Sequence, residues 1–130
     1  METIQTDRAP KALGPYSQAV RAGGFIFLSG QIALDPRTGD VVGADIEAQA
    51  RQVMANVRAI AEAAGRSMAD VVKTTVYLTD LSYFPKFNSV YESVFGAHRP
   101  ARSTVQVTAL PKGVRLELDA IVADGAGDST

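Results

Sequence analysis

The stretch RPARSTVQVTALPKGVRLELDAIVA (99–123) decides the fold class, because apolar and polar residues alternate along two segments of it. This alternation is typical of strands with one buried face, and it predicts one strand over 103–109 and another over 114–123. Between them, LPKG (110–113) has the proline and glycine that are common in tight connections. The stretch therefore predicts two strands of a sheet.

The second of these strands sorts its side chains onto two different faces. One face is entirely apolar and consists of Leu116, Leu118, Ala120 and Val122. The other face mixes charged side chains with one apolar side chain and consists of Arg115, Glu117, Asp119 and Ile121. Successive residues of a strand point to opposite sides of the sheet, so we expect the apolar face to pack against helices.

Three more strands are predicted earlier in the chain. Gly23 and Gly24 separate two short apolar runs, which indicates a hairpin. The run FIFL (25–28) is apolar at every position, and this predicts a strand that is buried on both faces. Alternation over 72–79, with Val72, Thr74, Val76 and Leu78 on one side, predicts another strand.

Two amphipathic helices are predicted between these strands. Asp45 is expected to cap the first helix, which ends at Gly65, and Pro85 fits the first turn of the second. The apolar face of the first helix consists of Ile46, Ala50, Val53, Met54, Val57, Ile60, Ala61 and Ala64. That of the second consists of Phe84, Phe87, Val90, Tyr91, Val94 and Phe95.

Together these elements predict an α+β fold in which one mixed sheet has two helices on one face. The whole chain, 1–130, is expected to form a single domain. Residues 1–15 are expected to form an extended arm and a loop, and DGAGDST (124–130) a frayed tail.

The second face of the sheet has no segment left to cover it. We therefore expect another subunit to cover this face. The alternative is a face open to solvent, which is ordinary for antiparallel sheets.

The composition argues against several classes of function. The net charge is −1 and no basic stripe is evident, so no nucleic-acid partner is expected. With no cysteine and one histidine, disulfides, a thiolate nucleophile and a transition-metal site are not expected. No apolar segment approaches the roughly 20 residues that span a bilayer, and no signal sequence is evident. We expect a cytoplasmic protein without a membrane partner.

Two charged residues of the deciding stretch are candidates for chemistry. The guanidinium of Arg102 could bind a carboxylate through two parallel hydrogen bonds, although a surface arginine at a strand end is the simpler interpretation. Glu117 lies on the face that we expect a partner to bury. Burial would raise its pKa toward the range useful for acid–base catalysis, whereas a structural salt bridge with Arg115 or Arg102 is the alternative.

Four other residues have weaker patterns. Tyr16, in GPYSQAV, could direct its hydroxyl from a rigid loop, or simply cover an edge of the core. Gly30 could let a ligand approach the backbone closely, or could be an ordinary turn residue. Asn88 is interpreted as a structural residue that ties a loop. His98 is interpreted as a histidine of a surface loop.

Five stretches, in order, resemble the Rid family of reactive intermediate deaminases, also called YjgF-like proteins. They are ALGPYSQAV, FLSGQIALDPRTG, DVVKTTVYLTD, FPKFNSVYESVF and PARSTVQVTALPKGVRLELDAI. The resemblance extends from about Ile4 to Ala123. PARS followed by a strand, a loop and a strand containing LEL is its most specific part, and the RidA subgroup is the nearest.

This resemblance implies a fold, an assembly and a reaction. The implied fold is chorismate-mutase-like, and the implied assembly is a homotrimer whose sheets form a central barrel with ligand clefts between subunits. The implied reaction is the hydrolysis of 2-imino acids, such as 2-iminobutanoate and 2-iminopropanoate, to 2-keto acids and ammonia. These imines form from enamines such as 2-aminoacrylate, and no cofactor is implied.

The resemblance also implies site residues. Arg102 matches the arginine that binds the substrate carboxylate, and Glu117 matches the glutamate that activates water. Tyr16 matches a tyrosine of the cleft, and Asn88 matches a helix asparagine near it.

Backbone groups of Gly30 and Thr104 match positions that contact the ligand. Many relatives have cysteine where this chain has Thr104, so thiol chemistry does not apply here.

Two other classes of function remain open from the sequence. One is a ligand-sensing protein that binds keto acids or amino acids without turnover. The other is a ribonuclease or translation inhibitor, an activity reported for some relatives, for which the net charge of −1 offers little phosphate binding.

Overall fold

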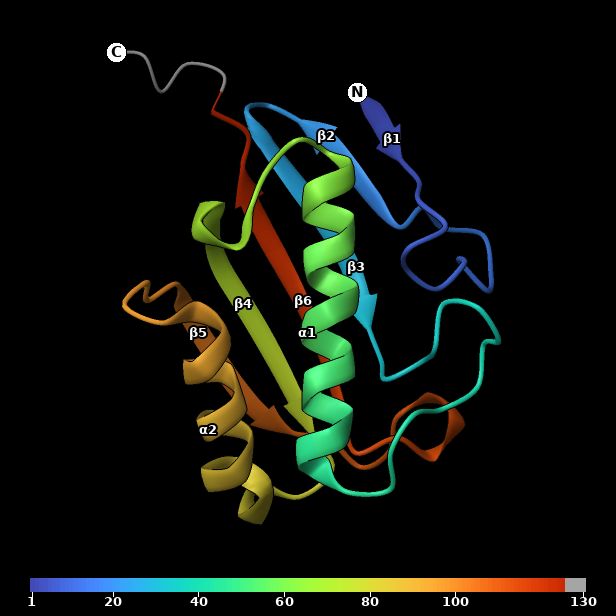
Figure 1. Ribbon diagram of the computed structural model, residues 1–130, viewed down its shortest axis with the longest axis vertical. Coiled ribbons are helices and arrows are strands. Elements are labelled where there is room, and N and C mark those ends of the chain that lie inside the picture. Colours follow the sequence, from blue (N-terminus) through green and yellow to red (C-terminus); the bar gives the residue numbers. More distant parts are fainter. Residues whose placement is uncertain (126–130) are drawn as a thin grey trace.

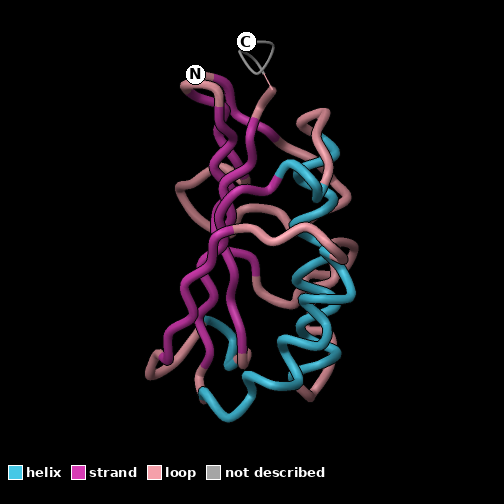
Figure 2. Tube along the Cα trace, turned by 90° about the vertical axis from the view of Figure 1, so that its left-hand side faces the viewer, coloured by secondary structure: helices cyan, strands magenta, loops and turns pink. Residues whose placement is uncertain are grey.

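The computed structural model describes residues 1–125, and these form one six-stranded mixed sheet with both long helices on the same face (Figures 1 and 2). In spatial order the strands are β1 (Glu2–Ile4), β2 (Ala19–Ala22), β3 (Phe25–Gln31), β6 (Leu116–Ala123), β4 (Val71–Leu78) and β5 (Ala101–Gln106). All neighbours are antiparallel except β4 and β5. The predicted α+β architecture is therefore confirmed.

The two helices are α1 (Ile46–Ala63) and α2 (Phe84–Phe95), and three short 3₁₀ turns complete the elements. These turns are η1 (Met68–Asp70), η2 (Leu81–Tyr83) and η3 (Pro111–Gly113). All eight predicted apolar positions of the first helix are buried. Asp45 caps α1 as predicted, because its carboxylate accepts a hydrogen bond from the amide of Ala48 at 2.8 Å.

The core lies between the helices and one face of the sheet, and β6 runs through the middle of that sheet. Its predicted apolar face is buried completely, with Leu116, Leu118 and Val122 at 0% exposure. The opposite face of β6 carries half-buried side chains, among them Glu117 and Asp119. The alternation read from the sequence therefore places Glu117 on the side of the sheet away from the helices.

The prediction that 25–28 is buried on both faces is wrong for the single chain. Ile26 and Leu28 are buried beneath α1, but Phe25 is 43% exposed and Phe27 is 45% exposed. Both phenylalanines lie on the open face, where Phe27 is the register partner of Ile121. One chain has two helices for one face of its sheet and leaves the other face uncovered (Figure 2).

Some predicted boundaries also differ from the structure. The arm contains β1, which pairs with β2. The strand predicted over 103–109 ends at Gln106, because its partner β4 ends at Leu78. Val72 points away from the core because an irregularity in the β4–β6 pairing gives the buried position to Val71. The predicted tail beyond residue 125 lies outside the described residues.

Among residues 1–125, none of the helices combines the length and the apolar character needed to cross a bilayer.

The cap of α1 gives a test of the fold. Replacing Asp45 by alanine leaves the amide of Ala48 without its acceptor, and we expect the free energy of unfolding to fall by about 1 kcal/mol. Urea denaturation at fixed chain concentration measures this loss. Asp40→Ala is the control, because that exposed side chain accepts no hydrogen bond in the described structure. An equal loss in both variants would contradict the capping role.

Candidate active site

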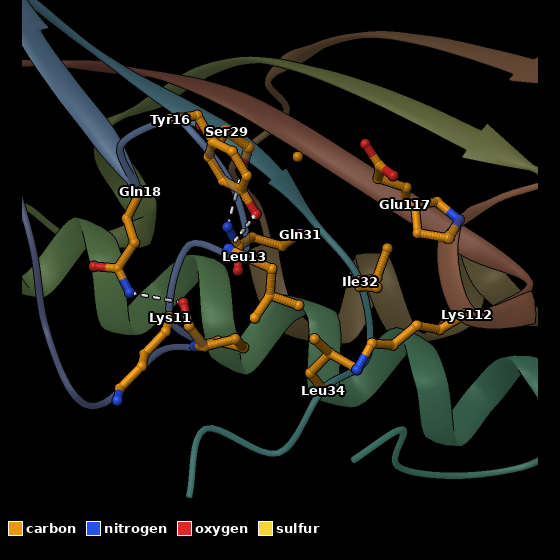
Figure 3. Close-up of a pocket in the computed structure, with 13 residues that line it drawn as sticks. Lys11, Leu13, Tyr16, Gln18, Ser29, Gln31, Ile32, Leu34, Lys112 and Glu117 are labelled. Atoms are coloured by element: carbon orange, nitrogen blue, oxygen red, sulfur yellow. Dashed lines mark hydrogen bonds between the residues drawn. The ribbon is translucent and has the colours of Figure 1, made fainter. Parts of the chain in front are cut away.

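A cavity of about 460 Å³ opens beside Glu117 (Figure 3). Its walls come from the loop before β2, the end of β3, η3 and β6. Three of the predicted site residues line it, namely Tyr16, Gly30 and Glu117. Segments far apart in the sequence therefore converge on one candidate site.

The carboxylate of Glu117 occupies the space where a side chain at position 30 would begin. A Cβ atom placed on Gly30 would lie 2.2 Å from Oε2 of Glu117, which is far inside van der Waals contact. The pairing of β3 with β6 also shifts register between Leu28 and Gln31, on either side of this glycine. Gly30 is therefore the residue that leaves room for the carboxylate, and its interpretation as a simple turn glycine is insufficient.

Glu117 has a raised pKa. Burial is the main cause, because it disfavours the charged form, and the neighbouring charge of Asp119 adds to it. Among residues 1–125, no arginine or lysine forms a salt bridge with Glu117. Arg115 instead donates to the carbonyl of Ala44 at 2.8 Å and to the hydroxyl of Tyr83. The alternative of a structural salt bridge within the chain is therefore wrong.

Asp119 is itself held in place. The hydroxyl of Tyr77 donates to its carboxylate at 3.0 Å, and this bond raises the pKa of Tyr77. Asp119 therefore keeps a fixed position two residues from Glu117 on the same face of β6.

Tyr16 lies on a short loop at the edge of the cavity and is 52% exposed. Its hydroxyl accepts a hydrogen bond from the amide of Leu13 at 3.2 Å, and its amide donates to the carbonyl of Gly14 at 2.8 Å. Both hydrogen bonds are within the loop. This placement fits the interpretation of Tyr16 as a cleft residue better than that of an edge cover.

Arg102 and Asn88 meet at a different place, between β5 and α2. The Nη1 atom of Arg102 donates to Oδ1 of Asn88 at 2.9 Å. The guanidinium carbon also lies 4.8 Å from the ring centroid of Tyr91, 5.1 Å from that of Phe84 and 5.9 Å from that of Phe87. Cation–π attraction and one hydrogen bond thus hold the guanidinium, which lines a second, more polar cavity.

Within one chain the structure does not bring Arg102 and Glu117 together. Arg102 is the register partner of Thr74, and Thr74 pairs in turn with Ala120, which faces the helices. Glu117 is on the opposite face of β6. The two charged groups therefore lie on different sides of the sheet and line different cavities.

Two other predicted residues have distinct surroundings. The hydroxyl of Thr104 is buried and has no hydrogen-bond partner in the described part of the chain. His98 lies in the loop after α2, as predicted, but it is held there, because it is half-buried beside Phe95 and its Nε2 group donates to the carbonyl of Val71 at 2.6 Å. His98 therefore fastens the end of α2 to β4.

The sequence did not point to Gln18, which holds the loop that carries Tyr16. This glutamine is buried, and its amide donates to the carbonyls of Thr6, Ala9 and Pro10 at 2.8–3.3 Å. Its carbonyl accepts from the amide of Thr6 at 2.7 Å. A glutamine next to an apolar strand gives no pattern that would reveal these partners, which are all backbone groups.

Over residues 1–125 no group of three or more His, Cys, Asp or Glu side chains is arranged to hold a metal ion.

Comparison with known proteins places the chain in a family. The model of the family described as endoribonuclease L-PSP matches residues 6–124. The chain belongs to this family, the YjgF/Rid family. The match covers nearly the whole chain, including every predicted site residue.

Curated Rid relatives are about half identical to this chain. A RutC family protein of Pyrococcus horikoshii is 54% identical over 120 residues, covering 92% of this chain and 95% of its own. The 2-iminobutanoate/2-iminopropanoate deaminase of Escherichia coli is 51% identical over 123 residues, with coverages of 92% and 95%. The relatives named as deaminases support imine deaminase activity in general terms, and other relatives carry other names.

Solved structures of Rid proteins have the same fold. A structure described as a putative endoribonuclease of Thermotoga maritima has a TM-score of 0.92 and 50% identity, covering 95% of this chain and 97% of its own. Escherichia coli TdcF with bound serine has a TM-score of 0.90 and 48% identity, with coverages of 95% and 98%. The mixed sheet with two helices is therefore the fold of the family.

The Gly30–Glu117 contact gives a test of the site. In Gly30→Ala the new methyl group displaces the carboxylate toward solvent, so we expect the pKa of Glu117 to fall toward its ordinary value. Carbon-detected NMR titration of Glu117 measures the shift. Gly14→Ala is the control, because its Cβ would lie at an ordinary 3.6 Å from the ring of Tyr16. An unchanged Glu117 pKa in Gly30→Ala would refute the contact.

The raised pKa of Glu117 also predicts how stability depends on pH. Below the unfolded pKa, about 4.3, Glu117 is protonated in both states, so the fold buries no charge there. As the pH rises through the folded pKa, stability is lost because the fold then buries a charge. We therefore expect Glu117→Gln to be more stable than wild type at pH 7, with the difference shrinking toward pH 4.

Urea denaturation at both pH values, at one chain concentration, measures this difference. Glu92→Gln is the control, since Glu92 is exposed and forms only a surface ion pair with Arg99. A gain at pH 4 as large as that at pH 7 would show that the effect does not come from the charge.

Proposed function

We propose that this protein is a member of the RidA subgroup that hydrolyses reactive 2-imino acids, such as 2-iminobutanoate and 2-iminopropanoate, to 2-keto acids and ammonia. One observation carries the proposal. A carboxylate with a raised pKa, free of any salt bridge in residues 1–125, lies against a glycine in an open cavity. Such a group can accept a proton from water near neutral pH. The deaminase name of relatives that are half identical supports the same reaction.

The proposal includes an assembly, because Arg102 and Glu117 lie on opposite faces of the sheet in one chain. A site that contains both residues therefore needs a second copy. The open face carries exposed Phe25 and Phe27, which is typical of a surface that another chain covers. We propose a homotrimer in which these faces meet around a central barrel. In this arrangement Arg102 of one copy lies across a cleft from Glu117 of its neighbour.

The chemistry follows from the roles of the groups in that cleft. Arg102, held by Asn88, binds the substrate carboxylate and so places the C=N carbon near Glu117. The oxygen of a water molecule bonds to that carbon while the second C=N bond breaks and its electron pair moves to nitrogen. Glu117 takes a proton from the water and returns it to that nitrogen. Transfer of the hydroxyl proton to nitrogen then breaks the C–N bond, which leaves the keto acid and ammonia.

The remaining residues set the surroundings of this reaction. Backbone groups of Gly30 and Thr104 provide fixed dipoles near the developing charge. Tyr16 closes the cleft and holds the water. Every step uses only water and proton transfer, so the reaction as written needs no cofactor, and the substrates are those of cytoplasmic amino-acid metabolism.

A coupled assay tests the function. A threonine or serine dehydratase generates the imine, and semicarbazide traps whatever is not hydrolysed. Wild type should lower the trapped amount of imine. The activity of Arg102→Ala should be at least about a hundredfold lower, because the substrate carboxylate loses the guanidinium that binds it. Binding of keto acids by wild type without any imine hydrolysis would instead identify a ligand-sensing protein.

A mixing experiment tests whether the cleft joins two copies. Arg102→Ala and Glu117→Gln chains, each inactive alone, are unfolded together in equal amounts and refolded. About one site in four should then contain both intact residues, so about a quarter of wild-type activity should return. Each variant refolded by itself is the control. No recovery in the mixture, with folded trimers present, would contradict a site shared between copies.

A further inference from the structure

The cavity beside Glu117 is lined by two kinds of side chain (Figure 3). Tyr16, Ser29 and Glu117 bring polar groups to it. Its apolar lining consists of Leu13, Ile32, Leu34, Pro10 and Pro111. The proposed reaction uses polar groups and leaves the apolar lining without a function.

The apolar wall is built to keep its shape. Asn56 of α1 is fully buried, and its amide donates to the carbonyls of both Ile32 and Leu34, at 3.2 and 3.1 Å. A buried side chain with two backbone acceptors fixes the segment after β3 relative to the helix. The position of the wall is therefore set before any ligand arrives, as a specificity pocket requires.

Lys112 lines the same cavity. Its backbone has φ +57°, a left-handed conformation that long side chains rarely adopt. Its ammonium donates to the carbonyl of Gly39 at 3.3 Å, so its aliphatic stem runs along the cavity past Leu34 (Figure 3). The strained turn thus places four methylene groups beside the apolar wall and keeps the charge outside it.

We infer that this apolar lining receives the side chain of the substrate, and that the protein prefers imino acids with branched or longer apolar side chains to the three-carbon 2-iminopropanoate. The inference rests on the proposed function. A carboxylate bound by Arg102 and an imine carbon beside Glu117 leave the third substituent to point along the cavity. In the single chain, before a neighbour adds Arg102 to the cleft, the cavity has about 460 Å³, which is more than a methyl group needs.

The expected ratio of kcat/KM between a large and a small imine depends on how many apolar groups of the substrate fill the cavity. In apolar pockets each matched methylene group changes kcat/KM by about tenfold or more. The imine of leucine has three more carbons than that of alanine. We therefore expect kcat/KM for the leucine imine to be at least about tenfold higher than for 2-iminopropanoate.

The test uses one source for both imines. D-Amino-acid oxidase, with catalase to remove peroxide, converts D-alanine and D-leucine to their achiral imines, and oxygen uptake sets equal rates of supply. Semicarbazide trapping then gives the ratio of kcat/KM for the two imines. Leu13→Ser should lower the value for the leucine imine about tenfold and leave that for 2-iminopropanoate within about twofold.

Two further variants serve as controls. Leu13→Met keeps an apolar side chain and should retain the preference. Leu81→Ser removes another exposed leucine, 45% exposed and outside the cavity lining, and should change neither rate. Leu13 is 64% exposed, so its replacement leaves the core intact.

Three results would overturn the inference while leaving the proposed function in place. They are equal kcat/KM values for both imines in wild type, an equal loss for both in Leu13→Ser, and a change of oligomeric state in Leu13→Ser, which would assign this leucine to a subunit interface. Hydrolysis of neither imine by wild type would overturn the proposed function itself.

Discussion

The alternation of side chains along β6 is the constraint on which the rest of the molecule depends. Its neighbours are β3 on one side and β4 on the other, so it fixes the register of the middle of the sheet. Leu116, Leu118 and Val122 commit one face to the helices. The same alternation then obliges Glu117 and Asp119 to share the other face. A shift of one residue would exchange these two sets, burying both carboxylates and exposing the core.

The candidate site lowers the stability of the fold at neutral pH. Glu117 has no ion-pair partner among residues 1–125, and its burial disfavours the charged form. Arg102 shows the opposite treatment, since its charge is satisfied in part by Asn88 and in part by aromatic rings of α2. Among residues 1–125 one charged group is left without an ion-pair partner, and the other is held still.

Periodic features of the fold were predictable from the sequence, and features that depend on partners far along the chain were not. Asp45 and the apolar faces of α1 and β6 follow from local spacing, and the structure confirms them. An uncovered face was expected, but four apolar residues in a row do not show that Phe25 and Phe27, rather than Ile26 and Leu28, lie on it. Val72 is exposed because the pairing of β4 with β6 shifts register beside it. The residues around Val72 in the sequence give no sign of this shift.

The candidate residues were identified by resemblance more than by physics. Spacing alone left Arg102 and Glu117 with structural alternatives, and only the structure excludes a salt bridge between Glu117 and an arginine of the described chain. Only the structure shows why residue 30 has to be glycine, because a Cβ atom there would collide with the carboxylate of Glu117. The role of Gln18 depends on backbone carbonyls of residues 6–10, which have no signature in the sequence.

The placement of Arg102 and Glu117 on opposite faces of one sheet has a consequence for when the protein works. In the proposed assembly a newly made chain is folded but inert, since neither half of its site has its complement. Activity then depends on encounters between chains and rises more steeply than the amount of protein. A cell that makes little of this protein would have almost none of its activity, and the level of synthesis would act as a threshold.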